Sequence, residues 1–169
     1  MVIRLPQGQE IEEKLYSILD AVSDPEIPVL SIVQMGVVRS ARLSGDEAYV
    51  EITPTYSGCP AMDVIGEDVT KALNSAGFKE NVKLVLSPPW TTDWLTESAR
   101  AALQEYGIAP PLNAEADKAV LAGSERLVIC PQCKSKNTKM ISPFGSTACK
   151  ALFQCEDCLE PFDYFKCLK

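Results

Sequence analysis

Cys130-Pro131-Gln132-Cys133 is followed, after 21 intervening residues, by a second pair of cysteines, Cys155-Glu156-Asp157-Cys158. Each CxxC pair turns tightly enough to present two sulfur atoms to one ion, and this spacing is typical of a four-sulfur tetrahedral site. The segment 126–169 is too short to bury a core of its own, so we expect metal binding and folding to be coupled. The sequence therefore predicts a C-terminal metal-binding β-ribbon.

Zinc is the first choice for the ion held by Cys130, Cys133, Cys155 and Cys158. A single iron ion or an iron–sulfur cluster can use the same four thiolates, and the sequence leaves these alternatives open. The chain contains no histidine. This excludes Ser-His-Asp and Cys-His catalysis, as well as the commonest general base. We therefore expect an accessory protein rather than an enzyme.

The composition favours a cytoplasmic protein. Among the 169 residues, no stretch approaches the roughly 18–20 apolar residues of a membrane span, and the N-terminus lacks the apolar core of a secretion signal. Six of the seven cysteines follow residue 129, which favours metal or thiol chemistry over disulfides. Residues 1–125 carry a net charge of −10 and residues 126–169 a net charge of +3. The acidic body opposes nucleic-acid binding.

Two further cysteines, Cys149 and Cys167, lie in the ribbon outside the CxxC pairs. If residues 146–154 and 161–167 pair as a hairpin, these two side chains face one another. One interpretation is that each is a small buried apolar side chain. The other is that they are auxiliary thiols for redox chemistry or metal transfer.

The rest of the chain predicts a small α+β domain. Apolar spacing favours helices at 9–22 and 61–76, and Thr96 can cap a third that ends before Gly107. Strands are expected at 37–43, 48–53 and 82–86, in a mostly hairpin-built sheet of three strands whose first turn is Ser44-Gly45-Asp46. We expect domains at 1–108 and 126–169, joined by a linker at 109–125 that is rich in Ala, Pro, Asn and Asp.

Cys59 is the lone cysteine of the body. It follows a strand and precedes Pro60, a favoured first residue of a helix, so the helix dipole is expected to lower its pKa. Asp24 and Glu26 lie near it if their loop folds over, and Thr55 is one of several hydroxyl residues close by in sequence. A single thiol cannot hold an iron–sulfur cluster alone. The alternative is a helix-capping cysteine without chemistry.

Four motifs resemble the small SufT-like family over residues 9–107. They are Asp24-Pro25-Glu26-Ile27, Met35-Gly36-Val37-Val38, Thr55-Tyr56-Ser57-Gly58-Cys59-Pro60 and Pro89-Trp90-Thr91. That family is tied to iron–sulfur protein assembly. The resemblance implies that Cys59 is the reactive or cluster-related residue, with Asp24 and Glu26 in its motif.

Motifs in the C-terminal segment point to a more specific family. The runs Phe144 to Phe153 and Glu160 to Cys167, together with Trp90-Thr91-Thr92-Asp93-Trp94, resemble the PaaD family of accessory subunits of the bacterial phenylacetyl-CoA epoxidase system. This implies a role in aerobic phenylacetate degradation and partners among the oxygenase and reductase subunits. Such proteins are thought to mature the complex rather than to catalyse epoxidation.

Several functions remain as alternatives. The leading hypothesis is a maturation factor that assists iron–sulfur cluster or iron insertion into an oxygenase or reductase component. A second is a non-catalytic docking subunit of the same complex, and a third is a nucleic-acid-binding ribbon. A fourth is a thiol enzyme that uses Cys59, but the sequence offers no evident general base for it. The sequence leaves open whether the chain forms a dimer.

Overall fold

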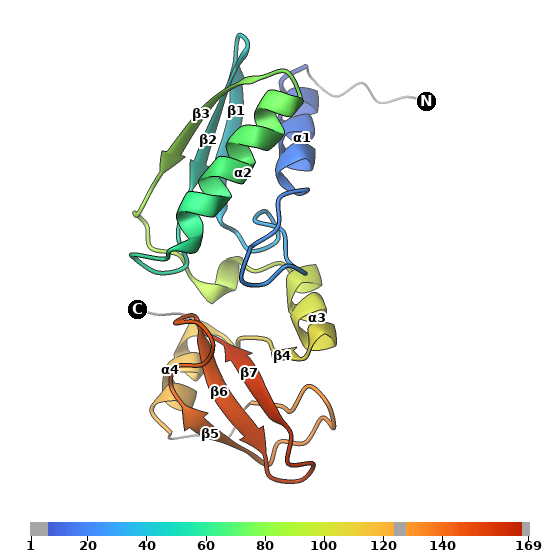
Figure 1. Cartoon of the computed structure of the whole chain (residues 1–169), viewed down its shortest axis with the longest axis vertical. Helices are drawn as coiled ribbons and strands as arrows, with labels where there is room; N and C mark the ends of the chain where they lie inside the picture. The colour runs from blue at the N-terminus through green and yellow to red at the C-terminus, as the bar shows by residue number, and fades with distance from the viewer. Residues whose placement is uncertain (1–6, 124–127, 167–169) are drawn as a thin grey trace. The chain divides into compact units, whose positions relative to one another are not determined.

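A computed structural model describes residues 7–123 and 128–166. The chain forms two compact units that divide between Pro89 and Trp90 (Figure 1). None of the helices in this described part of the chain combines the length and apolarity that a membrane crossing needs.

The first unit is a three-stranded sheet with two helices. Its elements are α1 (Gln7–Leu19), β1 (Val38–Ser44), β2 (Glu47–Ile52), α2 (Ala61–Ser75) and β3 (Lys79–Leu84). The predicted hairpin joins β1 to β2, with Gly45 in the left-handed region at a φ of 66°. In contrast, β3 pairs with β2 in parallel, because α2 carries the chain back to the starting end of the sheet. The prediction of a mostly hairpin-built sheet is therefore correct for the β1–β2 pair and wrong for the β2–β3 pair.

Both helices bury an apolar stripe on one face of this sheet (Figure 1). Leu15 and Leu19 of α1 are completely buried, and so are Val69 and Leu73 of α2. The buried stripe of α1 begins at Leu15, because Ile11, one turn earlier, is 38% exposed. The loop that carries the lone cysteine follows β2, the central strand of this sheet, and leads into α2.

The second unit is a four-stranded sheet with two helices and a short 3-10 turn. Its elements are η1 (Thr92–Trp94), α3 (Glu97–Tyr106), β4 (Ile108–Ala109), α4 (Ala114–Leu121), β5 (Thr138–Ser142), β6 (Lys150–Cys155) and β7 (Pro161–Phe165). The strand order is β4-β7-β6-β5, antiparallel except for the parallel β4–β7 pair. Trp90 is buried edge-to-face against Phe165, with ring centroids 5.9 Å apart, so its side chain packs within this unit.

Part of the expected linker is folded. Asn113 caps α4 by accepting a hydrogen bond of 2.8 Å from the Ala116 N–H. Ala109 and Val120 then enter one core with Phe153 and Tyr164 of the ribbon. The ribbon strands alone cannot bury such a core, so this segment completes it. The α+β class is confirmed, whereas the boundaries 1–108, 109–125 and 126–169 stay a prediction about separate domains.

The predicted helix capped by Thr96 forms as α3, but it belongs to the second unit. The Ala99 N–H donates to the Thr96 hydroxyl over 3.1 Å, and the helix ends at Gly107 as expected. Its Gln104 amide donates to the carbonyl oxygen of Pro131 over 3.2 Å. This contact joins α3 to the first cysteine loop.

A buried carboxylate links three segments of the second unit. Asp117 of α4 is 2% exposed and accepts hydrogen bonds from the Tyr164 hydroxyl, the Leu112 N–H at 3.0 Å and the Thr92 hydroxyl at 3.3 Å. Burial raises the pKa of Asp117, and these donors oppose that shift. Hydrogen bonds that the sequence pattern did not reveal therefore hold this carboxyl group inside the second unit.

Replacing Tyr164 by Phe tests this network. Tyr164→Phe removes one donor from a buried carboxylate, which should lower the free energy of unfolding by about 1–3 kcal/mol in urea titrations of metal-loaded protein. The matched control is Tyr106→Phe at a position that is 54% exposed, where the change should stay within about 0.5 kcal/mol. Equal stability of the two variants would contradict the network's role.

Candidate functional site

The two cysteine loops of the ribbon have the same backbone form. The Cys130 N–H donates to the Ser135 carbonyl over 2.9 Å, and the Cys155 N–H donates to the Glu160 carbonyl over the same distance. Each loop closes on a left-handed residue directly after its second cysteine, Lys134 with a φ of 62° and Leu159 with a φ of 65°. The identical closure turns both sulfurs of each pair toward one point.

The four sulfur atoms converge on one centre. All of them lie within 4.8 Å of one another, with 3.8 Å between Cys130 and Cys158 and 3.5 Å between Cys133 and Cys155. A tetrahedral ion bonded to sulfur at about 2.3 Å separates its ligands by about 3.8 Å. The donor set therefore fits a single four-thiolate metal ion, as the CxxC spacing predicts.

Burial divides this centre into an inner and an outer half. Cys130 and Cys155 are completely buried and belong to the core of the second unit, whereas Cys133 and Cys158 are exposed. The Cys158 N–H donates to the Cys155 sulfur over 3.5 Å and lowers the pKa of Cys155 to about 7. The pKa values of Cys133 and Cys158 are raised, so Cys155 is the sulfur of these three that gives up its proton most readily.

Cys149 does not join the four-sulfur group. The expected hairpin forms between β6 and β7. Just beyond the last residue pair of this hairpin, the Lys166 N–H donates to the Cys149 carbonyl over 2.9 Å. Cys149 is buried, with its sulfur 3.1 Å from the Thr147 hydroxyl. Cys167 lies outside the described residues, so the facing thiol pair stays a prediction.

Cys59 lies in the loop that connects β2 to α2. Its N–H donates to the Tyr56 carbonyl over 3.2 Å, and its half-buried sulfur receives hydrogen bonds from the Ala61 N–H and the Tyr56 hydroxyl. Thr55 is buried in the same loop. Of the several hydroxyl residues that the sequence places near the thiol, Tyr56 is the one whose hydroxyl donates to the sulfur. A role for Thr55 stays a prediction.

The loop that carries Asp24 and Glu26 lies near enough to this thiol for its charges to act on the sulfur. One carboxylate oxygen of Asp24 accepts hydrogen bonds of 2.8 Å from the N–H groups of Glu26 and Ile27, which fixes the loop. The negative charges of Glu26 and Asp24 both act on Cys59. The two carboxylates thus lie near enough for their charges to act on the thiol, although among the described residues only the four ribbon cysteines converge as a group of possible metal ligands.

The predicted lowering of the Cys59 pKa is wrong. Burial raises the pKa of this thiol, and the charges of Glu26 and Asp24 raise it further. The Ala61 N–H and the Tyr56 hydroxyl oppose the shift without reversing it. Pro60 rather than Cys59 occupies the N-cap position of α2, so the helix end acts on the sulfur chiefly through one N–H. Cys59 is consequently protonated at neutral pH.

The comparisons with known proteins agree with this two-part arrangement. An "Iron-sulfur cluster assembly protein" family model matches residues 12–84, and a "PaaD zinc beta ribbon domain" model matches residues 114–166. Fold and site therefore define a protein that joins an iron–sulfur assembly domain to a four-cysteine ribbon. The chain is 47% identical to one of the subunits of the "Putative 1,2-phenylacetyl-CoA epoxidase" of Escherichia coli (strain K12), over 96% of this chain and 94% of that one. It belongs to the PaaD family, which includes that E. coli protein.

Relatives of the first unit alone are also similar. The "Fe-S protein maturation auxiliary factor YitW" of Bacillus subtilis (strain 168) is 33% identical over 56% of this chain and 95% of its own length. A crystal structure of "Domain of Unknown Function DUF59" from Bacillus anthracis is 34% identical, with a TM-score of 0.53, over 57% of this chain and 93% of that chain. These similarities confirm the family resemblance and the fold of this unit.

The metal centre predicts a selective loss of metal on substitution. Cys130→Ser should remove the bound ion and unfold the ribbon, because the same side chain is both ligand and core residue. Cys149→Ser, also buried in the ribbon but outside the sulfur group, should keep one ion per chain. Elemental analysis by mass spectrometry measures both. Full metal content in Cys130→Ser would contradict the site.

The thiol site predicts a change in alkylation rate. Glu26→Gln removes a negative charge that disfavours the Cys59 thiolate, so the pKa of Cys59 falls and its reaction with iodoacetamide at neutral pH speeds up about two- to fivefold. Glu13→Gln, an exposed change on α1, should leave the rate unchanged. Peptide mass spectrometry resolves Cys59 from the other cysteines. A slower or unaltered rate in Glu26→Gln would refute the assigned electrostatics.

Proposed function

We propose that this chain is an accessory maturation factor of the multicomponent phenylacetyl-CoA epoxidase in aerobic phenylacetate degradation. It assists the insertion of an iron–sulfur cluster or iron into an oxygenase or reductase component. The observation that carries the proposal is that one chain, similar over nearly its whole length to a protein of that system, joins an iron–sulfur assembly domain to a four-cysteine ribbon.

The chemistry of Cys59 supports transient rather than permanent iron binding. Thiolate and carboxylate are both groups that iron accepts, and Glu26 and Asp24 are near enough to Cys59 for their charges to act on it. Since the thiol is protonated at neutral pH, binding must release a proton, which weakens the site. One thiol also leaves most coordination positions to other ligands. A site of this kind can hold its cargo until an acceptor protein supplies the remaining ligands.

We propose a structural zinc ion for the ribbon. The ion would be held by Cys130, Cys133, Cys155 and Cys158, and four thiolates leave it no open position for chemistry. Iron is the alternative on the same ligands. The ribbon then acts by presenting a rigid surface, and the protein is not itself an enzyme. Its reduced thiols suit the cytoplasm.

A purely structural docking subunit is the second candidate. It is favoured by large apolar side chains on the ribbon surface, where Phe144 is 59% exposed, Ile141 51% and Leu159 68%. Such side chains suit a partner interface when they form one patch. Under this candidate Cys59 has no role in the activity of the complex.

Cys59→Ser separates the two candidates. We expect the variant to co-purify with the oxygenase and reductase subunits, while phenylacetyl-CoA epoxidation and the iron and sulfide content of those subunits fall. The control is Cys149→Ser, which alters a buried thiol in the other unit and should leave both readouts unchanged. Full epoxidation with normal iron content in Cys59→Ser would exclude the maturation role and favour docking.

A further inference from the structure

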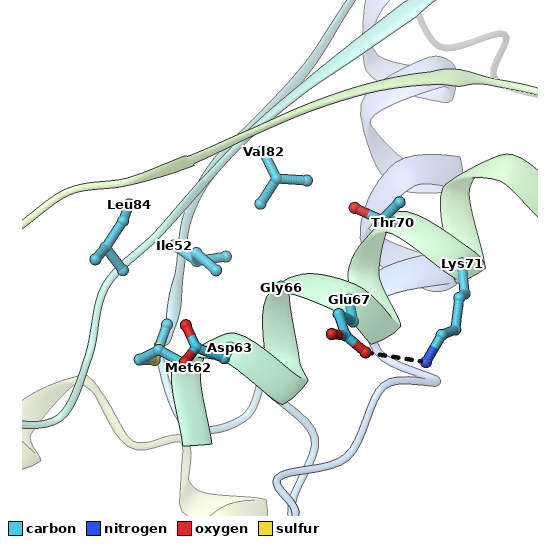
Figure 2. Close-up of a pocket in the computed structure, with 9 residues that line it drawn as sticks. All are labelled: Ile52, Met62, Asp63, Gly66, Glu67, Thr70, Lys71, Val82 and Leu84. Atoms are coloured by element: carbon cyan, nitrogen blue, oxygen red, sulfur yellow. Dashed lines mark ion pairs between the residues drawn. The ribbon is translucent and has the colours of Figure 1, made fainter. Parts of the chain in front are cut away.

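An apolar groove of about 540 Å³ lies between α2 and β3 in the first unit (Figure 2). Ile52, Val82 and Leu84 form its sheet wall, and Leu84 is 51% exposed there. Because alternate residues of a strand point to opposite faces, Val82 and Leu84 face the side of the sheet that carries α2, whereas Lys83 lines a separate pocket on the other face. The groove is thus a part of the helix-bearing face that α2 leaves open.

Two stripes of α2 residues form the other wall of the groove, and each follows the four-residue spacing that places helix side chains in one row. The inner stripe, which is buried or half-buried, consists of Met62, Gly66 and Thr70. The outer stripe, which is exposed and charged, consists of Asp63, Glu67 and Lys71. The groove therefore has a mostly apolar floor and a charged rim that run side by side along the helix.

The packing of the described residues gives Gly66 no reason to be a glycine. Glycine in the middle of a helix is less stable than alanine, and a Cβ atom added at Gly66 meets nothing within 4 Å. The distance between two packed helices depends on the side chains at their contact. A glycine in the floor of the groove would let a further helix approach α2 closely.

The rim carries unbalanced negative charge. Lys71 is 3.7 Å from Glu67 and 3.0 Å from Asp68, so its charge is already balanced on α2. No cation of the described residues lies within ion-pair distance of Asp63. The end of the groove at Asp63 therefore favours an occupant with a basic side chain.

The helices of a second copy do not suit this rim. Each α-helix in the described part of the chain, α1 to α4, carries more acidic than basic side chains. The one arginine of α3, Arg100, already donates to the carbonyl oxygens of Pro111 and Thr92. Charge therefore favours a helix from a different protein.

We propose that the α2–β3 groove docks an amphipathic helix of a partner protein that carries basic residues along one flank of its apolar stripe. The helix packs on the sheet face beside α2, as a further helix of the same layer, with apolar side chains against Val82 and Leu84. Its basic flank faces α2 and lies beside Asp63. Since stripe and flank are adjacent on a helix surface, both can face the groove at once.

The groove ends close to the thiol loop. The Met62 N–H donates to the Cys59 carbonyl over 3.3 Å, so the floor of the groove begins one turn of α2 away from Cys59. Under the maturation role proposed above, the partner is the acceptor protein, and the groove holds it near the thiol.

Gly66 offers a matched pair of variants. Gly66→Ala and Gly66→Leu both replace a helix glycine by a good helix former and should stabilise α2 to a similar degree. Only the leucine side chain is long enough to fill the groove. Circular dichroism melting of the full chain checks that both variants fold as the parent does.

The probe is a fluorescein-labelled helical peptide with a stripe of leucines, lysines along one flank of the stripe, and alanine and glutamine elsewhere. The full, metal-loaded chain is titrated into it, and fluorescence anisotropy measures the Kd. Gly66→Leu should bind the peptide about tenfold more weakly than Gly66→Ala, because the leucine takes the space of the apolar stripe.

Charge and thiol variants complete the test. Asp63→Asn should weaken binding about two- to fivefold, whereas Glu13→Gln, an exposed change on α1, should leave the Kd unchanged. Cys59→Ser should bind the peptide as the parent does, so a failure of docking and a failure of the maturation role can be told apart.

Four outcomes would overturn the proposal. They are no binding of the lysine peptide to the parent, equal binding to Gly66→Leu and Gly66→Ala, equal binding of a peptide with glutamate in place of lysine, and equal binding of a peptide with a central proline. The last would show that the occupant need not be a helix. A parent dimer that Gly66→Leu dissociates in sedimentation analysis would overturn it too, and would assign the groove to a second copy.

Discussion

The convergence of four sulfur atoms on one point is the constraint on which the second unit depends. Cys130 and Cys155 serve both as ligands of that point and as members of the core, beside Phe153 and Tyr164. An ion at the centre therefore joins two loops that are distant in sequence and holds the core side chains that pack behind them. Without it, four polar thiols would have to be brought together by a very small core alone.

The two sulfur sites of the chain differ in the number of thiols that they provide, four in the ribbon and one in the first unit. The ribbon provides four cysteine sulfurs that converge on one point, and the pKa of one of them, Cys155, is lowered to about 7. The first unit provides one protonated thiol with Glu26 and Asp24 beside it, so its ligand set is incomplete. A closed site retains its metal, whereas an incomplete one releases cargo to an acceptor. This contrast links the fold to a maturation role.

Local patterns in the sequence predicted most of the elements, and tertiary effects account for the errors. The CxxC loops and the Gly45 turn depend on neighbouring residues only, so their geometry could be read directly. The parallel pairing of β3 could not, because it depends on where α2 returns the chain. The Cys59 pKa was predicted with the wrong sign because desolvation and the charge of Glu26 come from the folded surroundings. The Asp117–Tyr164 hydrogen bond joins residues 47 positions apart and left no local signal, although the Asn113 cap of α4 did.

Zinc K-edge X-ray absorption on the purified full chain tests the central claim most directly, because it measures the ligands around the ion rather than its quantity. The account predicts a single shell of four sulfur atoms at about 2.3 Å, with no nitrogen or oxygen neighbours. A first shell that contains oxygen or nitrogen would contradict the closed four-thiolate centre. So would protein that holds iron in place of zinc and shows an iron–iron distance at the iron K-edge.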